Sequence, residues 1–275
     1  MKPAPFDYVR PDSLNEVHAL LASEGADARI LAGGQSLVPM LSMRLTRPKL
    51  VIDIMRVPAV SDIRIEANEI RVACGVRQAA LMAWPDLARH QPLLAAALPW
   101  VGHAQTRSRG TVCGSIAQAD PSAELPLLLL TLNGSIELSS RKKRRRVPAA
   151  AFFTGAMSTE RQDEELIEAV RFPCLAPGAG TAFNEFGRRH GDFAIVACAA
   201  IADGQGARLG IGGVADRPML RDFGQLDGRA LDEALDAFAW DLDARDDLHA
   251  TARYRRELVR QIGRQTIEEA RRCRA

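Results

Sequence analysis

Two adjacent glycines separate a short apolar run from a helical pattern near the N-terminus, and this junction limits the folds open to the chain. Residues 29–32 are predicted to form a strand, Gly33-Gly34 permits a sharp turn, and residues 36–43 can form a helix. Amide N–H groups at the start of a helix lack partners within it, so such a turn suits a phosphate group. Glycine pairs are also common in tight strand–helix turns that bind nothing. The junction therefore predicts a strand–turn–helix unit and leaves both interpretations open.

A second segment of small residues and hydroxyl groups lies about eighty residues further along the chain. Gly110-Thr111-Val112-Cys113-Gly114-Ser115 is predicted to be a glycine-bearing loop, followed at residues 123–132 by an apolar helix that Asn133-Gly134 ends. Two such loops could hold the two phosphates of one diphosphate. The chain lacks the common dinucleotide and P-loop motifs, and the closest approximation, Gly210-x-Gly212-x-x-Ala215, precedes Pro218 where a helix should continue. That approximation is interpreted as the end of a strand.

The remaining patterns predict an α+β chain without internal repeats. Ser13 and Glu16 have capping-box spacing, and the helix they begin leads through residues 29–43 to a strand at residues 50–54, so a small parallel unit is expected. A hairpin is predicted to turn at Ala67-Asn68. The later predicted segments are antiparallel strands at 135–138 and 166–172, a proline- and glycine-rich linker at 173–180, strands at 181–186, 193–201 and 207–214, and helices from 231 onward.

Composition excludes several classes of protein. Of the 275 residues, 47% are hydrophobic and 25% charged, which rules out a disordered, collagen-like or coiled-coil chain. The formal net charge of +2 gives no long-range attraction for nucleic acid or an anionic membrane. The longest apolar run, at residues 125–132, is far shorter than the ~20 residues that span a bilayer, and residues 1–10 do not resemble a signal peptide. A cytoplasmic protein is expected.

Cysteine spacing and a basic run give two further expectations. The five cysteines are scattered without a C-x-x-C pair, so no zinc or iron–sulfur centre is expected in this chain. Residues 141–146 (RKKRRR) lack the interleaved aromatic residues that stack on nucleic-acid bases. They are predicted to form a solvated hairpin tip or a loop that faces a partner.

Four segments in order along the chain carry a family resemblance: residues 32–54 (AGGQSLVPMLSMRLTRPKLVIDI), 107–130 (RSRGTVCGSIAQADPSAELPLLLL), 163–173 (DEELIEAVRFP) and 183–197 (FNEFGRRHGDFAIVA). They closely resemble the FAD-binding medium subunit of the molybdenum hydroxylases, the carbon monoxide dehydrogenase, xanthine dehydrogenase and aldehyde oxidase type of enzyme. The resemblance implies an α+β, PCMH-like FAD-binding fold of two subdomains, at residues 1–57 and 58–176. It also implies a C-terminal flavoprotein domain at residues 177–275, with a three-stranded antiparallel sheet and a helical bundle.

The resemblance also implies a site. In the family, the two glycine loops wrap the FAD diphosphate, an acidic side chain past the second loop contacts the flavin, and apolar residues line it. Carried over by motif, the expected FAD-binding residues are Leu31, Ala32, Gly33, Gly34, Gln35, Ser36, Leu37, Val101, Gly110, Thr111, Val112, Cys113, Gly114, Ser115, Asp120, Glu124, Leu166, Ile167 and Phe193. No side chain is expected to act as catalytic acid, base or nucleophile, because the flavin carries the redox step.

The chain departs from the family pattern in two places. Many relatives have Gly-Gly where this chain has Cys113-Gly114, so Cys113 must tolerate the backbone of the loop or lie against the cofactor. Some relatives carry a lysine near the flavin ring where this chain has Asn184 and Glu185. The groups that tune the flavin potential are therefore not assigned by the resemblance.

The implied function is that of an FAD-carrying electron-transfer subunit in a molybdenum-containing hydroxylase or dehydrogenase. The implied partners are a small subunit with 2Fe–2S clusters and a large molybdopterin subunit, in a dimer of heterotrimers. NAD, a quinone or oxygen would accept the electrons. Two alternatives remain open, a self-sufficient flavin oxidase of the same fold and a non-redox module that binds a diphosphate ligand. The organic substrate is not identified.

Overall fold

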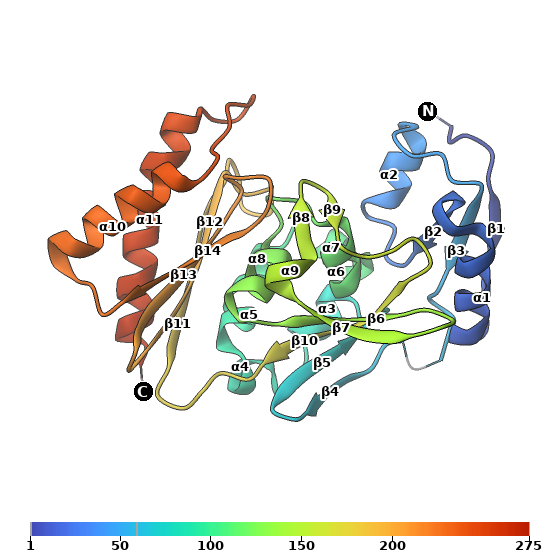
Figure 1. The fold of residues 1–275 in the computed structure, drawn as a ribbon, viewed down its shortest axis with the longest axis horizontal. Helices are drawn as coiled ribbons and strands as arrows, with labels where there is room; N and C mark the ends of the chain where they lie inside the picture. The colour runs from blue at the N-terminus through green and yellow to red at the C-terminus, as the bar shows by residue number, and fades with distance from the viewer. Residues whose placement is uncertain (1, 59, 275) are drawn as a thin grey trace.

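The computed structural model describes residues 2–58 and 60–274, and three sheet-based units lie in a row along its long axis (Figure 1). The first unit is a parallel sheet of strand order β1-β3-β2. Its elements are β1 (Asp7–Val9), α1 (Leu14–Glu24), a 3-10 turn (Gly25–Asp27), β2 (Ala28–Leu31), α2 (Leu37–Ser42) and β3 (Leu50–Asp53). The predicted strand–turn–helix junction and the parallel unit are confirmed, with β1 as an additional strand.

The start of α1 follows from its sequence. The Ser13 side chain accepts a hydrogen bond from the Glu16 N–H at 3.2 Å, while the Glu16 carboxylate accepts from the Asp12 N–H at 3.0 Å. In the standard capping box the second bond is donated by the N–H of the cap residue, here Ser13, whereas in this chain the preceding residue donates it. On the buried side of α1, His18 Nε2 lies 2.9 Å from Ser139 Oγ, which joins the first unit to the second.

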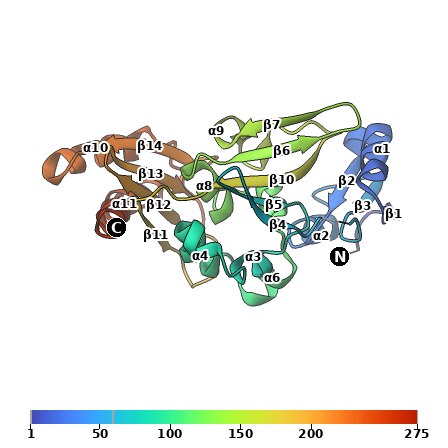
Figure 2. The ribbon, with the colours of Figure 1, turned by 90° about the horizontal axis from the view of Figure 1, so that it is seen from below.

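The second unit is an antiparallel sheet of strand order β4-β5-β10-β6-β7, whose strands run across the view in Figure 2. The strands are β4 (Ile63–Glu66), β5 (Glu69–Ala73), β6 (Ser135–Ser139), β7 (Arg144–Pro148) and β10 (Leu166–Pro173). Ala67 and Asn68 both have positive φ in the turn between β4 and β5, as the predicted hairpin requires. The other elements are α3 (Gln78–Met82), α4 (Leu87–His90), α5 (Pro92–Ala97), a 3-10 turn (Leu98–Trp100), α6 (Ala104–Arg109), α7 (Val112–Gln118), α8 (Glu124–Thr131), α9 (Ala149–Phe152), β8 (Phe153–Gly155) and β9 (Ser158–Thr159).

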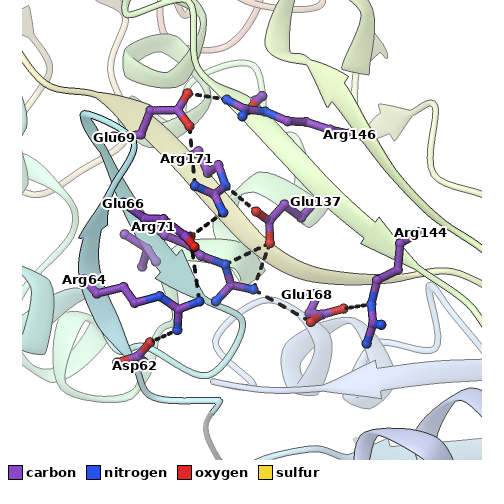
Figure 3. A network of polar contacts seen from close by, with 12 residues as sticks. Asp62, Arg64, Glu66, Glu69, Arg71, Glu137, Arg144, Arg146, Glu168 and Arg171 are labelled. Carbon is purple, nitrogen blue, oxygen red and sulfur yellow. Dashed lines mark hydrogen bonds and ion pairs between the residues drawn. The ribbon is translucent and has the colours of Figure 1, made fainter.

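A ladder of alternating charges covers the outward face of this sheet (Figure 3). Arg171 is paired with Glu66, Glu69 and Glu137, and Arg71 lies 2.8 Å from Glu137. Cross-strand pairs of opposite charge stabilise a sheet face that remains in contact with water. The ladder accounts for the many charged residues on these strands without invoking a ligand.

The basic run is only partly a solvated hairpin tip. Residues 141–143 lie in the turn, but residues 144–146 belong to β7, where each arginine forms ion pairs. Arg145 points to the opposite face from its neighbours and binds Glu165, whose side chain is 1% exposed. The tip is therefore shorter than predicted, because residues 144–146 pair with acidic residues of β5, β10 and the segment before β10, which are distant in sequence. Arg144 and Arg146 are still exposed to solvent, as predicted.

The third unit contains β11 (Gly180–Phe186), β12 (Val196–Asp203), β13 (Gly206–Gly212), β14 (Met219–Gly224), α10 (Gly228–Asp241) and α11 (Ala252–Arg272). The expected three-stranded sheet has a fourth strand, in the order β11-β12-β13-β14. The sequence did not reveal β14 because it is an edge strand with Arg221 and Asp222 side by side instead of apolar alternation. α10 and α11 pack against each other, and α11 covers β11 and β12.

Helix α8 connects the second and third units. All of its residues are buried, and it packs against β12 and β13 of the third unit. A helix that is apolar on every side must be covered on every side, which explains its place between two sheets. Within the part of the chain that the structure describes, no helix is both long and apolar enough to cross a membrane.

Candidate cofactor site

A cavity of about 930 Å³ collects most of the residues expected to bind FAD. It is lined by Ala32, Gly33, Gly34, Gln35, Ser36, Leu37, Val101, Gly110, Thr111, Cys113, Gly114, Ser115, Asp120, Glu124, Leu166, Ile167 and Phe193. Leu31 instead lines an adjoining pocket of about 590 Å³ that shares the first glycine loop. Val112 is fully buried in the core and lines neither space. The fold therefore brings together segments that are far apart in the sequence.

The two glycine loops touch each other through their backbones. A Cβ atom on Gly33 would lie 2.7 Å from the Gly110 Cα and would also collide with the Arg109 carbonyl oxygen. Gly34 has a φ of +74°, a conformation that residues with side chains rarely adopt. Both glycines are required, Gly33 by the close approach and Gly34 by the turn.

The first loop, residues 33–37, lines the cavity with residues whose backbone amide groups are not used within the fold. Among the described residues, the N–H groups of this loop donate no hydrogen bond, and the Val38 N–H is the first to close a turn, on the Gly34 carbonyl. All five residues of the loop line the cavity. Free amide donors around an enclosed space are suited to an anionic ligand.

The second loop is helical, which corrects the expectation of an open loop. Thr111 caps α7, and its hydroxyl accepts the Gly114 N–H at 3.1 Å. The Ser115 N–H bonds the Thr111 carbonyl, and the Val112 N–H bonds the Val76 carbonyl. The sequence did not predict that Thr111 begins a helix, because valine and glycine, which follow it, are weak helix formers. This segment therefore offers a ligand fewer free amides than the first loop does.

Cys113 lies under the site with its thiol turned away from the loop. It is 3% exposed, and its Sγ lies 3.6 Å from the Val72 carbonyl oxygen on β5. Burial raises the pKa of this thiol well above its ordinary value. The residue that departs from the family pattern is thus accommodated by the core.

The third unit closes one end of the cavity with the segment between β11 and β12. Gly191 and Phe193 line the space, and Phe193 remains 65% exposed. His190 stacks on Trp100, with 4.6 Å between the ring centroids. Gly191, with a φ of +88°, lies so close to His103 that a Cβ atom would not fit. These contacts hold the segment against the second unit.

One buried carboxyl group, Glu124, and two half-buried ones, Asp120 and Glu185, lie at the same junction. Burial raises the pKa of Glu124 to about 7 and that of Asp120 above its ordinary value. Asn184 donates to Thr266 and Glu269 on α11, so Glu185, next along β11, points to the opposite face of the sheet. Burial, with a smaller contribution from the charge of Glu124, raises the pKa of Glu185 to about 8. Its Oε2 atom has no hydrogen-bond partner among the described residues.

We expect the Glu185→Gln variant to be more stable than the parent chain in alkaline solution. As pH rises above the ordinary value of 4.5, the unfolded chain loses the proton of Glu185 before the folded chain does, so stability falls until about pH 8. Glutamine removes this loss, and the melting temperature at about pH 9 should rise by a few degrees with no gain at about pH 4. Glu233→Gln on exposed α10 is the matched control. An equal effect at both pH values would contradict the expectation.

The cavity wall also contains residues that the sequence did not single out. Arg161 lines the cavity and donates to the carbonyls of Gln162 and Glu165, both at 2.7 Å. Gln78 and Met40 line it as well. No motif marks these residues; the only local signal for Gln78 is its place at the start of a helix that follows a strand.

Comparison with known proteins matches most of the chain to two family models. Residues 4–175 match the model described as FAD binding domain in molybdopterin dehydrogenase, and residues 181–270 match the CO dehydrogenase flavoprotein C-terminal domain. The chain is 39% identical to the 6-hydroxypseudooxynicotine dehydrogenase complex subunit alpha of Paenarthrobacter nicotinovorans, over 98% of this chain and 96% of that one. It is 32% identical to the carbon monoxide dehydrogenase medium chain of Hydrogenophaga pseudoflava, over 98% of both chains.

Solved structures agree with these matches. Carbon monoxide dehydrogenase from Hydrogenophaga pseudoflava superimposes with a TM-score of 0.95 at 31% identity, covering 100% of both chains. Quinoline 2-oxidoreductase from Pseudomonas putida 86 gives a TM-score of 0.92 at 33% identity, covering 99% of both chains. The predicted α+β fold class is confirmed. The chain therefore belongs to the family of FAD-binding medium subunits of molybdenum hydroxylases, which form part of oxidoreductases, and its cofactor is FAD.

Proposed function

We propose that this chain relays electrons from 2Fe–2S clusters on a small partner subunit to an external acceptor, which is NAD, a quinone or oxygen. These clusters would receive their electrons from a large molybdopterin subunit, and the three subunits would form a cytoplasmic dimer of heterotrimers. The names of the relatives support a multi-subunit assembly, since they include a complex subunit alpha and medium chains. As part of the same proposal, residues 1–57, 58–176 and 177–275 act as two FAD-binding subdomains and a flavoprotein domain.

The residues of the cavity fit FAD. The first loop lines the space and its amide groups have no partner among the described residues, so it suits a diphosphate, while Val101, Leu166 and Ile167 give an apolar wall suited to a ring system. When bound, FAD supplies reversible one- and two-electron transfer through its isoalloxazine ring. The task of this chain is to bind, orient and shield it. The single observation that carries the proposal is that both glycine loops and the Gly191–Phe193 segment line one cavity.

The two alternatives make different demands on this cavity. A self-sufficient flavin oxidase needs room for an organic substrate beside the ring, and a non-redox module needs no path for electrons. Phe193 lines the cavity and its side chain is largely exposed, so an acceptor or a partner cluster can approach the cavity from outside at this residue. The electron relay accounts for this accessible position most directly.

The test compares the chain alone with the complex. The purified chain loaded with FAD should not be reduced by any organic substrate of the complex, tested with carbon monoxide, aldehydes and nitrogen heterocycles. Its chemically reduced form should still be reoxidised by an acceptor, because that half-reaction needs no partner. In the complex, substrate should bleach the flavin absorbance in stopped flow. Substrate-driven bleaching in the chain alone would favour the oxidase, and a colourless chain that binds another diphosphate would favour the non-redox module.

A further inference from the structure

Gln78 is a buried side chain whose hydrogen bonding is incomplete. It is the first residue of α3, is 5% exposed and lines the cavity. Its Oε1 atom is enclosed and has no hydrogen-bond partner among the described residues. A carboxamide offers two donors and an acceptor, and burying such a group without partners destabilises the fold. The free chain therefore gives no structural reason for glutamine at this position.

Gln91 shows how this chain treats a glutamine with a structural role. It is fully buried outside the cavity, and its Nε2 donates to the Pro173 carbonyl at 2.7 Å. Its Oε1 accepts the Leu93 N–H at 3.3 Å. Both glutamines are buried, but only Gln91 has hydrogen-bond partners for both the oxygen and the nitrogen of its amide. Gln78 lines the cavity, and its amide oxygen has no partner among the described residues.

The surroundings of Gln78 place its carboxamide where the two glycine loops meet. The Gln78 N–H donates to the Gly110 carbonyl at 2.9 Å, and a Cβ atom on Gly110 would lie 2.9 Å from Gln78 Oε1. Arg77, directly before it, donates from Nη1 to the Arg109 carbonyl at 2.5 Å. Gly33 packs on the same Arg109–Gly110 backbone. The Arg77 side chain and the Gln78 backbone thus support the junction between both loops.

We propose that Gln78 is an FAD-binding residue whose carboxamide hydrogen-bonds a polar group of the cofactor, in the part of FAD that passes between the two glycine loops. The inference rests on the proposed placement of the FAD diphosphate against those loops. A phosphate oxygen or a ribityl hydroxyl group can complete the hydrogen bonding that the protein leaves open. Arg77 is a positioning residue, because its bond to the Arg109 carbonyl fixes the backbone that carries Gln78.

The test measures FAD affinity and the stability of the FAD-free chain in the same variants. Gln78→Met keeps the unbranched shape and removes the amide. The dissociation constant for added FAD, followed by quenching of flavin fluorescence, should rise about tenfold, equivalent to about 1.4 kcal/mol. The melting temperature of the FAD-free chain should stay the same or rise, because an unpartnered buried amide is lost. Gln91→Met is the matched control and should lower that melting temperature while leaving FAD affinity unchanged.

The outcomes separate this inference from the proposed function. If the parent chain binds no FAD, the proposed function fails. If the parent binds FAD and Gln78→Met binds it equally well, only the inference about Gln78 is overturned. A Gln78→Met chain that is less stable without FAD and unchanged in affinity would show a structural role, which also overturns it. Gln78→Ala is measured in parallel, so that the result does not depend on how one replacement packs.

Discussion

Replacing Gly33 with alanine is expected to weaken FAD binding about a hundredfold. The added Cβ atom would overlap the Arg109 carbonyl and lie 2.7 Å from the Gly110 Cα, so the two glycine loops must separate. Those neighbours are backbone atoms and cannot rotate away as a side chain could. The free amides of residues 33–37 would then be displaced from the second loop, and the two loops could no longer hold one diphosphate together. Equilibrium dialysis of the purified chain against FAD measures the loss.

The matched control for this prediction is Gly204→Ala. Gly204 lies in a turn of the third unit, and an added Cβ atom there would meet nothing within 4 Å. It should therefore retain FAD like the parent chain. Gly33→Val should lose FAD at least as completely as Gly33→Ala, since valine carries the same Cβ atom and two further methyl groups. A yellow Gly33→Val protein with unchanged FAD content would show that the loops do not hold the diphosphate.

The sequence predicted the features that depend on neighbouring residues. Ala67 and Asn68 turn the β4–β5 hairpin, and Gly33 and Gly34 end β2, because each conformation is determined within a few residues. The apolar helix at residues 123–132 was also predictable, since its composition requires complete burial. Local signals of this kind predicted the order of most elements, whereas the expected site residues came from the family resemblance, and most of them line one cavity.

Features that depend on distant partners could not be predicted in this way. The strand β14 pairs with β13 at the edge of its sheet and carries no apolar alternation. Gln78 is placed in the cavity wall by its contact with the loop at Gly110. Arg145 is paired with carboxylates that follow it by fifteen to twenty residues. The basic run was therefore interpreted from its place next to a predicted strand as a hairpin tip, although half of it belongs to β7.

Replacing Arg145 with methionine is expected to lower the free energy of unfolding by about 3 kcal/mol and the melting temperature by roughly 6–12 °C. Arg145 makes two bonds of 2.7 Å to the buried Glu165 carboxylate and one of 2.7 Å to Glu160. Burial alone would raise the pKa of Glu165, but the hydrogen bonds from Arg145 and the Gln162 N–H outweigh it and lower the pKa. Without Arg145, a charged group stays buried with too few partners.

Two comparisons distinguish this pair from a general loss of surface charge. Lys142→Met, at the exposed hairpin tip, removes the same charge and should leave the melting temperature nearly unchanged. The double variant Arg145→Met/Glu165→Met should recover much of the stability, because replacing both partners leaves no unpaired charge in the interior. Since the folded pKa of Glu165 is lowered, the stability that it contributes is present above its ordinary value of 4.5 and is lost as pH falls. The difference between parent and Arg145→Met should therefore narrow in acid, and a difference that is the same at all pH values would mean that lost packing, not the ion pair, causes it.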